Sequence, residues 1–266
     1  MAHPRRRSAR ACLVGVVPLV GAGPGAPDLL TVRAAQLLAR ADIVFHDALI
    51  HPDTLALAAS AVKVAVGKRC GRHSTAQRFI NKRLLDAAAK YDVVVRLKGG
   101  DPMLFGRAQE EIEALEAANV RYEIVPGVTA AVAAAATLGT SLTQRGSVRA
   151  FALATPRVGD GERANDWIDV FRQAQAGAIY MGRKDAANIA ASLIGAGMAA
   201  ATPIAIVVDA SLPSVETHYT TLAQLPAFAS REISGAALLL VGPQFRHRKS
   251  SATANEVEAR AAVRRA

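Results

Sequence analysis

Short apolar runs alternate along the chain with stretches in which apolar residues recur every three or four positions. The short runs predict buried strands, and the recurring pattern predicts amphipathic helices. Their alternation indicates an α/β fold with a largely parallel sheet. The expected strands lie at about 13–21, 42–47, 62–67, 92–98, 122–127, 150–155, 176–182, 202–210 and 235–242, and the expected helices at about 31–41, 53–59, 75–90, 107–118, 129–138, 163–171 and 186–197.

Two domains are predicted because this pattern breaks near residue 140. The polar segment 140–149 separates two series of strands and helices, so we expect an N-terminal α/β domain over 12–140 and a C-terminal α/β domain over 141–245. The net charge of +10 lies mostly in the two ends of the chain. We therefore expect a basic, disordered N-terminus over 1–11 and a disordered tail over 246–266, although such ends could also bind nucleic acid.

The chain has two cysteines, Cys12 and Cys70, and no CxxC pair. This usage predicts a reducing compartment, the cytoplasm, with no disulfide framework and no metal site. The basic start and the apolar run behind it could also form a signal peptide, but the same run is needed for the first strand. No apolar stretch reaches the roughly 18 uninterrupted residues of a membrane span, so no membrane partner is expected.

The first expected strand carries Pro18 near its edge and leads into the segment LVGAGPGAPDLLT, residues 19–31, with glycines at alternate positions. The dinucleotide-binding pattern G-x-G-x-x-G needs a different spacing and a helix that opens at once. Here Pro24 and Pro27 each remove an N–H donor, and the next helix begins only near Thr31, its expected N-cap. The loop therefore suits close backbone approach to a ligand that is not an anion.

Other loops that follow expected strands hold further candidates, because ligands of parallel sheets bind beyond the carboxyl ends of the strands. Gly99 and Gly100 let the main chain approach a ligand, and the Asp101 carboxylate suits a ribose hydroxyl or an amino group, or simply a turn. Asp47 could be a general base, but from the residues alone a helix cap is favoured. Met181 could lie against an adenine or a thioether, although a core position is more usual.

The segment GKRCGRH, residues 67–73, places several cations after another expected strand. It lacks the G-x-x-x-x-G-K-[ST] spacing of a nucleoside triphosphate site. Cations at the rim of a crevice would suit a substrate rich in carboxylates, and a solvated loop is the alternative. The candidate substrate-binding cations are Lys68, Arg69 and Arg72, with Arg107 and Arg145 as possible additions.

Six segments together resemble one family. They are VGAGPGAPDLLT, DIVFHDALI, VGKRCGRH, VRLKGGDPMLFGRAQEE, PGVTAA and IYMG, and in this order they are similar to the uroporphyrinogen-III C-methyltransferases of the tetrapyrrole methylase family. The resemblance covers about residues 17–245. It implies the tetrapyrrole methylase fold, in which two α/β domains bind S-adenosylmethionine at an active site in the cleft between them, and it implies a homodimer.

The resemblance also implies roles for single residues. Asp47 matches the proposed proton acceptor and Lys68 the proposed proton donor, while the arginines, Arg69, Arg72, Arg107 and Arg145, would meet substrate carboxylates. The implied reaction moves two methyl groups onto carbons 2 and 7 of uroporphyrinogen III, giving precorrin-2 and S-adenosylhomocysteine, a step shared by siroheme and cobalamin synthesis. The positions that match cofactor contacts are Pro24, Gly99, Gly100, Asp101, Leu104, Thr129, Ala130, Met181 and Ala210.

The chain departs from the family pattern where histidines are expected, because Gln144 and Pro156 stand in the corresponding motifs. These changes put the placement of the substrate in doubt. One alternative is therefore a related methylase that acts on a later corrin intermediate, on RNA or on a protein. Another is a nucleic-acid-binding module that depends on the basic ends, whose deletion would then abolish function.

Overall fold

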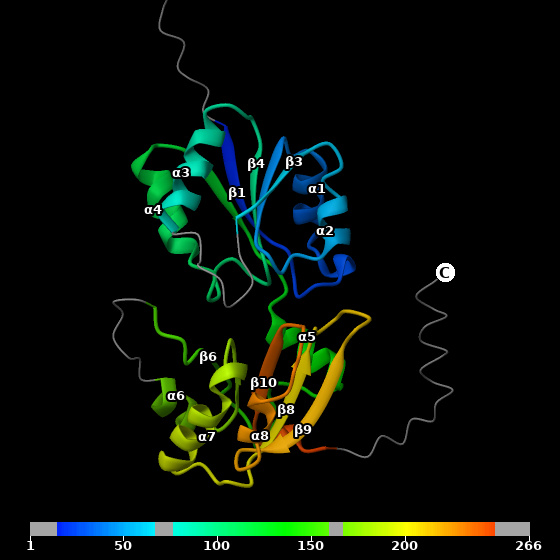
Figure 1. Ribbon diagram of the computed structural model, residues 1–266, viewed down its shortest axis with the longest axis vertical. Helices are drawn as coiled ribbons and strands as arrows, with labels where there is room; N and C mark the ends of the chain where they lie inside the picture. The colour runs from blue at the N-terminus through cyan, green and yellow to red at the C-terminus, as the bar shows by residue number, and fades with distance from the viewer. Residues whose placement is uncertain (1–14, 67–76, 160–166, 248–266) are drawn as a thin grey trace, which may run out of the picture. The chain divides into compact units, whose positions relative to one another are not determined.

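The computed structural model describes residues 15–66, 77–159 and 167–247. Its contacts divide these residues into two compact units (Figure 1). The first unit contains the described residues up to Ser141 together with Val207–Glu216 and Glu232–Leu238. The second contains Leu142–Ile206, Thr217–Arg231 and the described residues from Leu239 onward. The segment that holds Lys68, Arg69 and Arg72 lies outside the described residues.

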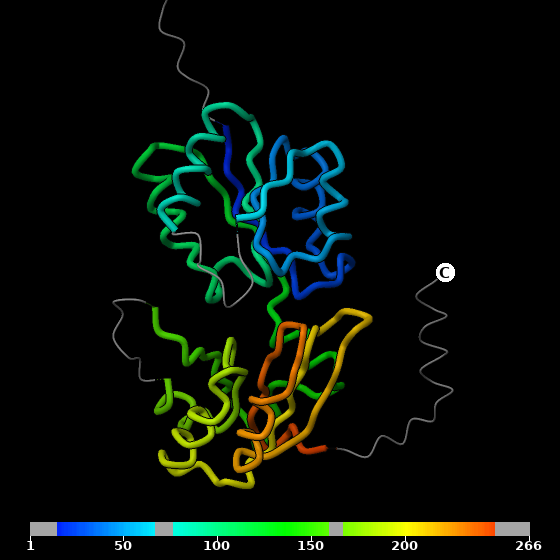
Figure 2. The backbone as a smooth tube through the Cα atoms, viewed as in Figure 1, coloured from blue at the N-terminus to red at the C-terminus, as the bar shows by residue number. Residues whose placement is uncertain are grey.

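The first unit is built on a five-stranded sheet with the strand order β3-β2-β4-β1-β5. Every neighbouring pair of strands is parallel, as the sequence pattern predicts. Figure 2 shows β1 beside β5, although the chain forms β2, β3 and β4 between them. The elements are β1 (Val16–Gly21), α1 (Val32–Ala39), β2 (Ile43–His46), α2 (Pro52–Ala56), β3 (Val62–Ala65), α3 (Gln77–Ala88), β4 (Val94–Lys98), α4 (Ala108–Ala117), β5 (Arg121–Val125) and α5 (Ala130–Leu138).

Helices cover both faces of this sheet, with α1 and α2 on one face and α3 and α4 on the other (Figure 1). On the first face Leu37 of α1 packs in a cluster with Val44 of β2. On the second face Leu84 of α3 and Leu115 of α4 pack with Val17 of β1. The inner strands β1, β2 and β4 are largely buried and read as continuous apolar runs, which is why they are visible in the sequence, whereas the edge strand β3 is mostly exposed.

Two local expectations about the start of the chain have different outcomes. Thr31 is the N-cap of α1, since its hydroxyl accepts a hydrogen bond from the N–H of Ala34 at 3.2 Å, and this prediction is confirmed. Pro18, expected near the edge of its strand, instead lies in the middle of β1, opposite Glu123 of β5. Because β1 lies between β4 and β5, the missing N–H of Pro18 removes a donor inside the sheet.

The second sheet has the strand order β6-β7-β10-β8-β9. Its β6 and β7 are parallel but β7 and β10 are antiparallel, so this sheet is mixed and not parallel throughout. The polar strand β9 was not predicted because its sequence, ETHYTT, contains no apolar run. The elements are β6 (Ala152–Ala154), α6 (Trp167–Ala174), β7 (Gly177–Ile179), α7 (Ala186–Gly195), β8 (Pro203–Val208), β9 (Glu216–Thr221), α8 (Pro226–Ala229) and β10 (Ala237–Val241), with 3-10 turns at Pro27–Leu29, Arg183–Asp185 and Pro243–Phe245.

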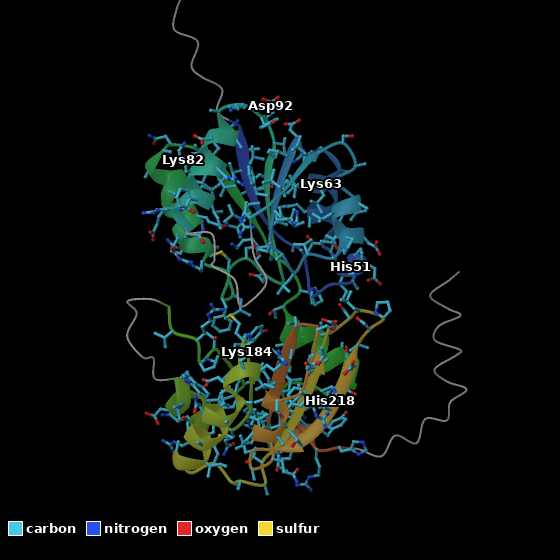
Figure 3. The ribbon with its side chains drawn as sticks, viewed as in Figure 1. His51, Lys63, Lys82, Asp92, Lys184 and His218 are labelled. Atoms are coloured by element: carbon cyan, nitrogen blue, oxygen red, sulfur yellow. The ribbon has the colours of Figure 1, made fainter. Side chains whose placement is uncertain are left out.

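Charged side chains at the periphery contrast with a few that are buried. Lys63, Lys82 and Asp92 lie on the outside of the first unit (Figure 3). Arg96, Lys98 and Glu111 are instead buried inside it. Burial of charge is unfavourable unless the charges are paired, so these residues form the starting point for the site. None of the helices in the described segments has the length and apolar character needed to cross a membrane.

Candidate functional site

The glycine-rich loops of the first unit meet at the carboxyl ends of β1 and β4. Gly23 and Gly100 exchange two backbone hydrogen bonds, with N···O distances of 3.2 and 2.8 Å. The chain leaves β1 toward α1 on one face of the sheet and leaves β4 toward α4 on the other. Adjacent strands whose connections diverge in this way mark the place where open α/β sheets bind ligands.

Three backbone segments approach one another closely at this point. A Cβ atom added to Gly21 would lie 2.6 Å from the nitrogen of Gly127, and one added to Gly127 would lie 2.2 Å from the oxygen of Gly100. Real Cβ atoms do not approach backbone atoms so closely, so glycine is required at both positions. A Cβ on Gly99 would meet nothing within 4 Å, so there is open space beside this residue. The loops therefore pack tightly around Gly21, Gly100 and Gly127, and we call this packed backbone surface the glycine floor. Gly99 lies beside it and has open space next to it.

This contrast predicts different effects of two alanine substitutions. Gly127→Ala should destabilise the protein by about 1 to 3 kcal/mol, because the backbone of Gly100 must move away from the added methyl group. Gly99→Ala should change the stability by less than about 0.5 kcal/mol, because its methyl group enters open space. Thermal unfolding of both variants by calorimetry measures the difference. Equal stability losses would show that the backbone around Gly127 is no more closely packed than that around Gly99.

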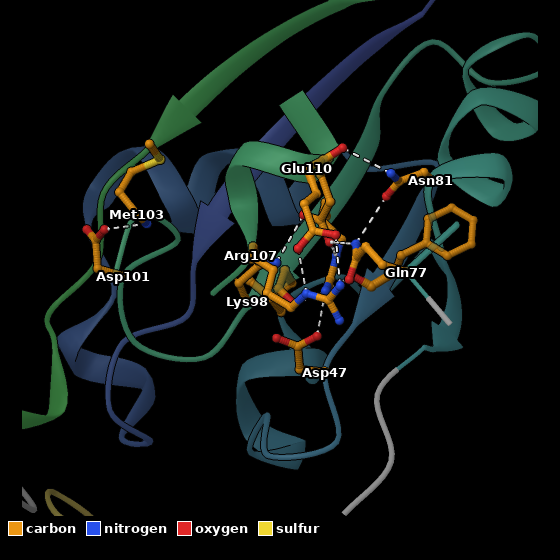
Figure 4. A network of polar contacts seen from close by, with 12 residues as sticks. Asp47, Gln77, Asn81, Lys98, Asp101, Met103, Arg107 and Glu110 are labelled. Atoms are coloured by element: carbon orange, nitrogen blue, oxygen red, sulfur yellow. Dashed lines mark hydrogen bonds and ion pairs between the residues drawn. The ribbon is translucent and has the colours of Figure 1, made fainter. Parts of the chain in front are cut away.

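Asp101 ties the loop after β4 to the loop after β5. Its Oδ1 accepts a hydrogen bond from the N–H of Met103 at 2.8 Å (Figure 4), and its Oδ2 accepts one from the N–H of Gly127 at 2.9 Å. The bond from Met103 supports the turn interpretation, but the bond from Gly127 shows that this carboxylate does not serve the turn alone. Each carboxylate oxygen keeps a second lone pair, so the same group can also accept from a ligand hydroxyl. Its role as a ligand contact stays a prediction.

The other predicted cofactor contacts of the first unit lie around the same floor. Thr129 precedes α5, and its Cα lies 4.0 Å from the Cβ that Gly100 lacks. Ala130 is the first residue of that helix. Leu104 lies in the loop after β4, where its N–H donates to the backbone carbonyl oxygen of Asp101 at 3.3 Å. The structure thus brings these residues together with Gly99 and Gly100. Pro24 follows Gly23 in the β1 loop and is half-buried.

Two predicted cofactor contacts follow strands of the second sheet. Met181 comes after β7 and is 46% exposed, with a left-handed backbone φ of 57°. The alternative that it belongs to the core is therefore wrong. A non-glycine residue held in this conformation is uncommon and often marks a functional position. Ala210 follows β8 and is buried. Contact of either residue with a cofactor stays a prediction.

Asp47 pairs with a buried cation. Nη2 of Arg96, from β4, donates to Asp47 Oδ1 at 2.6 Å, and the side chains are 3% and 33% exposed, respectively. The favoured interpretation of Asp47 as a helix cap is wrong, because His51 caps α2 through its ring Nδ1. Asp47 sits at the carboxyl end of β2, where its own N–H donates to the oxygen of Leu97. The structure thus presents this carboxylate at the same edge of the sheet as the glycine loops.

Behind Asp47 lies a buried group of charges that the sequence reasoning missed. Glu111 of α4 is fully buried, and its two carboxylate oxygens accept from Arg96 Nε at 2.9 Å and from Lys98 Nζ at 3.0 Å. Gln77 Nε2 donates to the same carboxylate at 3.1 Å (Figure 4). We call Asp47, Arg96, Lys98 and Glu111 the charge quartet; it holds two cations and two carboxylates. A signal was present, because residues 96 and 98 of one strand point to the same face, which α4 covers.

The surroundings of the quartet shift the pKa values of its two cations in opposite directions. Burial lowers the pKa of Lys98, and the neighbouring positive charge of Arg96 adds to this effect, with only partial opposition from Glu111. Burial also acts to lower the pKa of Arg96, but the attraction of Asp47 and Glu111 outweighs it and raises that pKa. Arg96 therefore remains charged, and the proton on Lys98 is the more easily lost of the two.

The remaining predicted substrate-binding cations that the structure describes are exposed. Arg107 has a left-handed φ of 55° and binds Glu110 through Nε and Nη2 at 2.6 and 2.7 Å. This contact lowers the pKa of Glu110. Arg145 lies in the turn between Gln144 and Val148, whose backbones pair. Substrate binding by Arg107 and Arg145 stays a prediction.

Known proteins resemble this chain over most of its length. The sequence model of the Tetrapyrrole (Corrin/Porphyrin) Methylases matches residues 16–226. The siroheme synthase of Azotobacter vinelandii is 42% identical over 237 residues, which are 88% of this chain and 51% of that protein. The siroheme synthase of Chromobacterium violaceum is 43% identical over 230 residues, 86% of this chain and 49% of that protein. The chain thus spans about half the length of these relatives.

Solved structures match most of this chain and nearly the whole of their own chains. The uroporphyrin-III C-methyl transferase of Thermus thermophilus, in complex with S-adenosylhomocysteine, has a TM-score of 0.76 and 37% sequence identity. This match covers 86% of this chain and 98% of that one. A cobalt precorrin-4 methyltransferase has a TM-score of 0.74 and 28% identity, over 87% and 96% of the two chains.

Proposed function

The chain belongs to the tetrapyrrole methylase family, and from this membership we propose that it transfers methyl groups from S-adenosylmethionine to carbons 2 and 7 of uroporphyrinogen III. The product of two transfers is precorrin-2. The observation that carries the proposal is the similarity to the uroporphyrin-III methyltransferase of Thermus thermophilus over 98% of that chain. The lower identity to the cobalt precorrin-4 methyltransferase, 28% against 37%, favours uroporphyrinogen III over a later corrin intermediate.

The floor of glycine loops fits this cofactor. The close contacts of Gly21, Gly100 and Gly127 bring main chain to the surface, and the open space beside Gly99 leaves room for a ligand. Pro24 removes a donor from the β1 loop, so the site is poor at holding phosphate and better suited to a ligand without phosphates. Asp101 lies at the edge of this floor, where a carboxylate can accept from a ribose hydroxyl. When bound, the cofactor supplies an electrophilic methyl group.

The residues of the chain then hold the tetrapyrrole in place and accept the proton that it loses. With the cofactor bound, an electron-rich pyrrole carbon would form the new bond to the methyl group while the bond between that methyl group and sulfur breaks, and S-adenosylhomocysteine would leave with the electron pair on sulfur. The tetrapyrrole would afterwards lose a proton. We assign the acceptance of this proton to Asp47, which is one-third exposed at the edge of the sheet. The assigned proton donor, Lys68, lies outside the described residues. Arg107 and Arg145, with Arg69 and Arg72 in the undescribed segment, would bind the carboxylates of the substrate.

The proposal covers the methylation step and no more of siroheme synthesis, because the chain spans about half of the siroheme synthases that it matches. Precorrin-2 is needed for both siroheme and cobalamin, and we assign the chain to this shared step. We also propose that the protein acts as a homodimer.

A transfer assay across acceptors separates this function from its alternatives. The purified protein is incubated with methyl-labelled S-adenosylmethionine and, separately, with uroporphyrinogen III, a later corrin intermediate, ribosomal RNA and a protein extract. We expect label only in the tetrapyrrole reaction that contains uroporphyrinogen III. Label in RNA or protein would contradict the proposal and would favour the alternative of a related methylase that acts on RNA or on a protein.

A further inference from the structure

Arg96 joins two carboxylates that come from different elements of the first unit. Its Nη2 donates to Asp47 Oδ1 at 2.6 Å, and its Nε donates to Glu111 Oε1 at 2.9 Å. Its Nη1 donates to the backbone oxygen of Leu97 at 3.1 Å and lies 3.5 Å from that of Phe45. Every nitrogen of the guanidinium therefore has a partner. A planar group bound on all sides is held in one orientation.

The inner end of this arrangement is rigid because Glu111 is itself fully bound. Gln77 donates to Oε1 at 3.1 Å and Lys98 donates to Oε2 at 3.0 Å. The Glu111 side chain is 0% exposed, and those of Arg96 and Lys98 are 3% exposed. Two buried cations beside two carboxylates need no further counter-charge. The charge quartet is thus a balanced cluster with a single member, Asp47, that reaches solvent.

The outer end of the arrangement presents one carboxylate oxygen. Arg96 binds Oδ1 of Asp47, whereas Oδ2 accepts no hydrogen bond from the part of the chain that the structure describes. The backbone of Asp47 is fixed by the bond from its N–H to the oxygen of Leu97, at 3.3 Å. The carboxylate can rotate little without losing the 2.6 Å contact with Arg96, so Oδ2 is held in place as well, on a side chain that is 33% exposed.

We propose that Arg96, braced by Glu111, is a positioning residue that holds Oδ1 of Asp47 and thereby leaves Oδ2 to receive the proton lost by the substrate. This inference rests on the proposed function, which makes Asp47 the proton acceptor. Lysine cannot replace Arg96 in this role, because Arg96 binds Asp47 and Glu111 through two separate nitrogens, Nη2 and Nε, whereas lysine offers a single ammonium group. Arg96 acts through Asp47 and not on the substrate.

The substitution Arg96→Lys tests this role while keeping a positive charge beside Glu111. We expect kcat for uroporphyrinogen III to fall by about 10- to 100-fold, the range known for partners that orient metal ligands, because the reacting carboxylate loses the group that orients it. The KM for uroporphyrinogen III and the Kd for S-adenosylhomocysteine should change by less than about twofold. A purely structural role predicts a different pattern, in which the fraction of active protein falls while kcat per folded molecule is unchanged.

A double-substitution cycle makes the test specific. If Arg96 acts only through Asp47, adding Arg96→Lys to Asp47→Asn should lower kcat by less than about threefold beyond the effect of Asp47→Asn alone. Effects that multiply would overturn the positioning role. The matched control is Arg172→Lys, the same substitution at an exposed ion pair with Asp169 in α6, which should leave kcat unchanged. Activity of the unmodified protein is measured in parallel, and its absence would overturn the proposed function itself.

Asp47→Glu provides a second variant in case Arg96→Lys does not fold. Asp47 is partly exposed, so the fold should tolerate one added methylene group. If Arg96 decides where the carboxylate lies, the longer side chain displaces the oxygen that Arg96 does not bind, and kcat should fall at least about tenfold with unchanged binding of S-adenosylhomocysteine. A kcat within about twofold of the unmodified value would show that any carboxylate near this position suffices, and would overturn the inference.

Discussion

Asp47→Asn is expected to lower kcat for uroporphyrinogen III by about 100- to 10,000-fold, the range typical of removing a general base. Asparagine has nearly the same shape as aspartate. Its amide oxygen can take the place of Asp47 Oδ1, which lies 2.6 Å from Arg96 Nη2, and can still accept that hydrogen bond. It cannot accept a proton. The affinity for S-adenosylhomocysteine, measured by calorimetry, should be unchanged, because the glycine floor does not include Asp47.

The control for this variant is Asp86→Asn, on α3. Asp86 also pairs with a cation, Lys82, at 2.7 Å, but both side chains are more than half exposed. Its substitution should leave kcat unchanged. Full turnover by Asp47→Asn with unchanged affinity for S-adenosylhomocysteine would show that Asp47 is not the base. It would also contradict the positioning role of Arg96, which acts through Asp47.

Glu111→Gln should cause the largest loss of stability, about 3 to 5 kcal/mol, the range measured when one partner of a buried ion pair is removed. The substitution leaves Arg96 and Lys98 as two buried cations that share only the partly exposed carboxylate of Asp47. Calorimetry is the suitable method, since a chain with two compact units can unfold in two transitions and the effect should appear in that of the first unit.

The same variant should show a characteristic dependence on pH. The pKa of Lys98 is lowered by burial and by Arg96, so its native state releases the proton at a lower pH than its unfolded state does. Stability therefore rises with pH between the two pKa values, because the unfolded state binds more protons there. Removing the charge of Glu111 lowers the native pKa of Lys98 further. The stability loss caused by Glu111→Gln should therefore be smaller at about pH 9 than at about pH 7.

Glu113→Gln, on the same helix, is the matched control for Glu111→Gln. Glu113 is exposed and, among the described residues, accepts a hydrogen bond only from Gln109, at 3.2 Å. Its substitution should change the stability by less than about 0.5 kcal/mol at either pH. Similar effects of the two substitutions would show that the charges around Glu111 are hydrated and not confined to a buried cluster.

The apolar pattern was sufficient to predict the first sheet, because its inner strands, β1, β2 and β4, are largely buried and leave continuous apolar runs. It failed for β9, whose sequence ETHYTT shows the preference of threonine and tyrosine for strands without an apolar pattern. It also could not reveal the mixed pairing of the second sheet, since the direction of a strand depends on which neighbour it joins. The antiparallel pairing of β10 with β7 is a tertiary contact between segments about 60 residues apart.

The candidate site was predictable in its loops and not in its charges. The glycine loops follow strands and can be read directly, but their contact depends on β4, β1 and β5 being neighbours. Asp47 was assigned to a cap because local partners are the ones visible in a sequence, whereas its partner, Arg96, is 49 residues away. Charged residues inside the apolar strand 94–98 were the clue to a buried partner on another element.

The central claim, that the chain methylates uroporphyrinogen III, is tested most directly by the mass of the product. The protein is incubated anaerobically with ¹³C-methyl S-adenosylmethionine and freshly generated uroporphyrinogen III, and the product is analysed by mass spectrometry and NMR. The account predicts a gain of two labelled methyl groups at carbons 2 and 7. An unchanged tetrapyrrole mass, with S-adenosylhomocysteine still bound by the protein, would contradict it and would mean that the site serves a different acceptor.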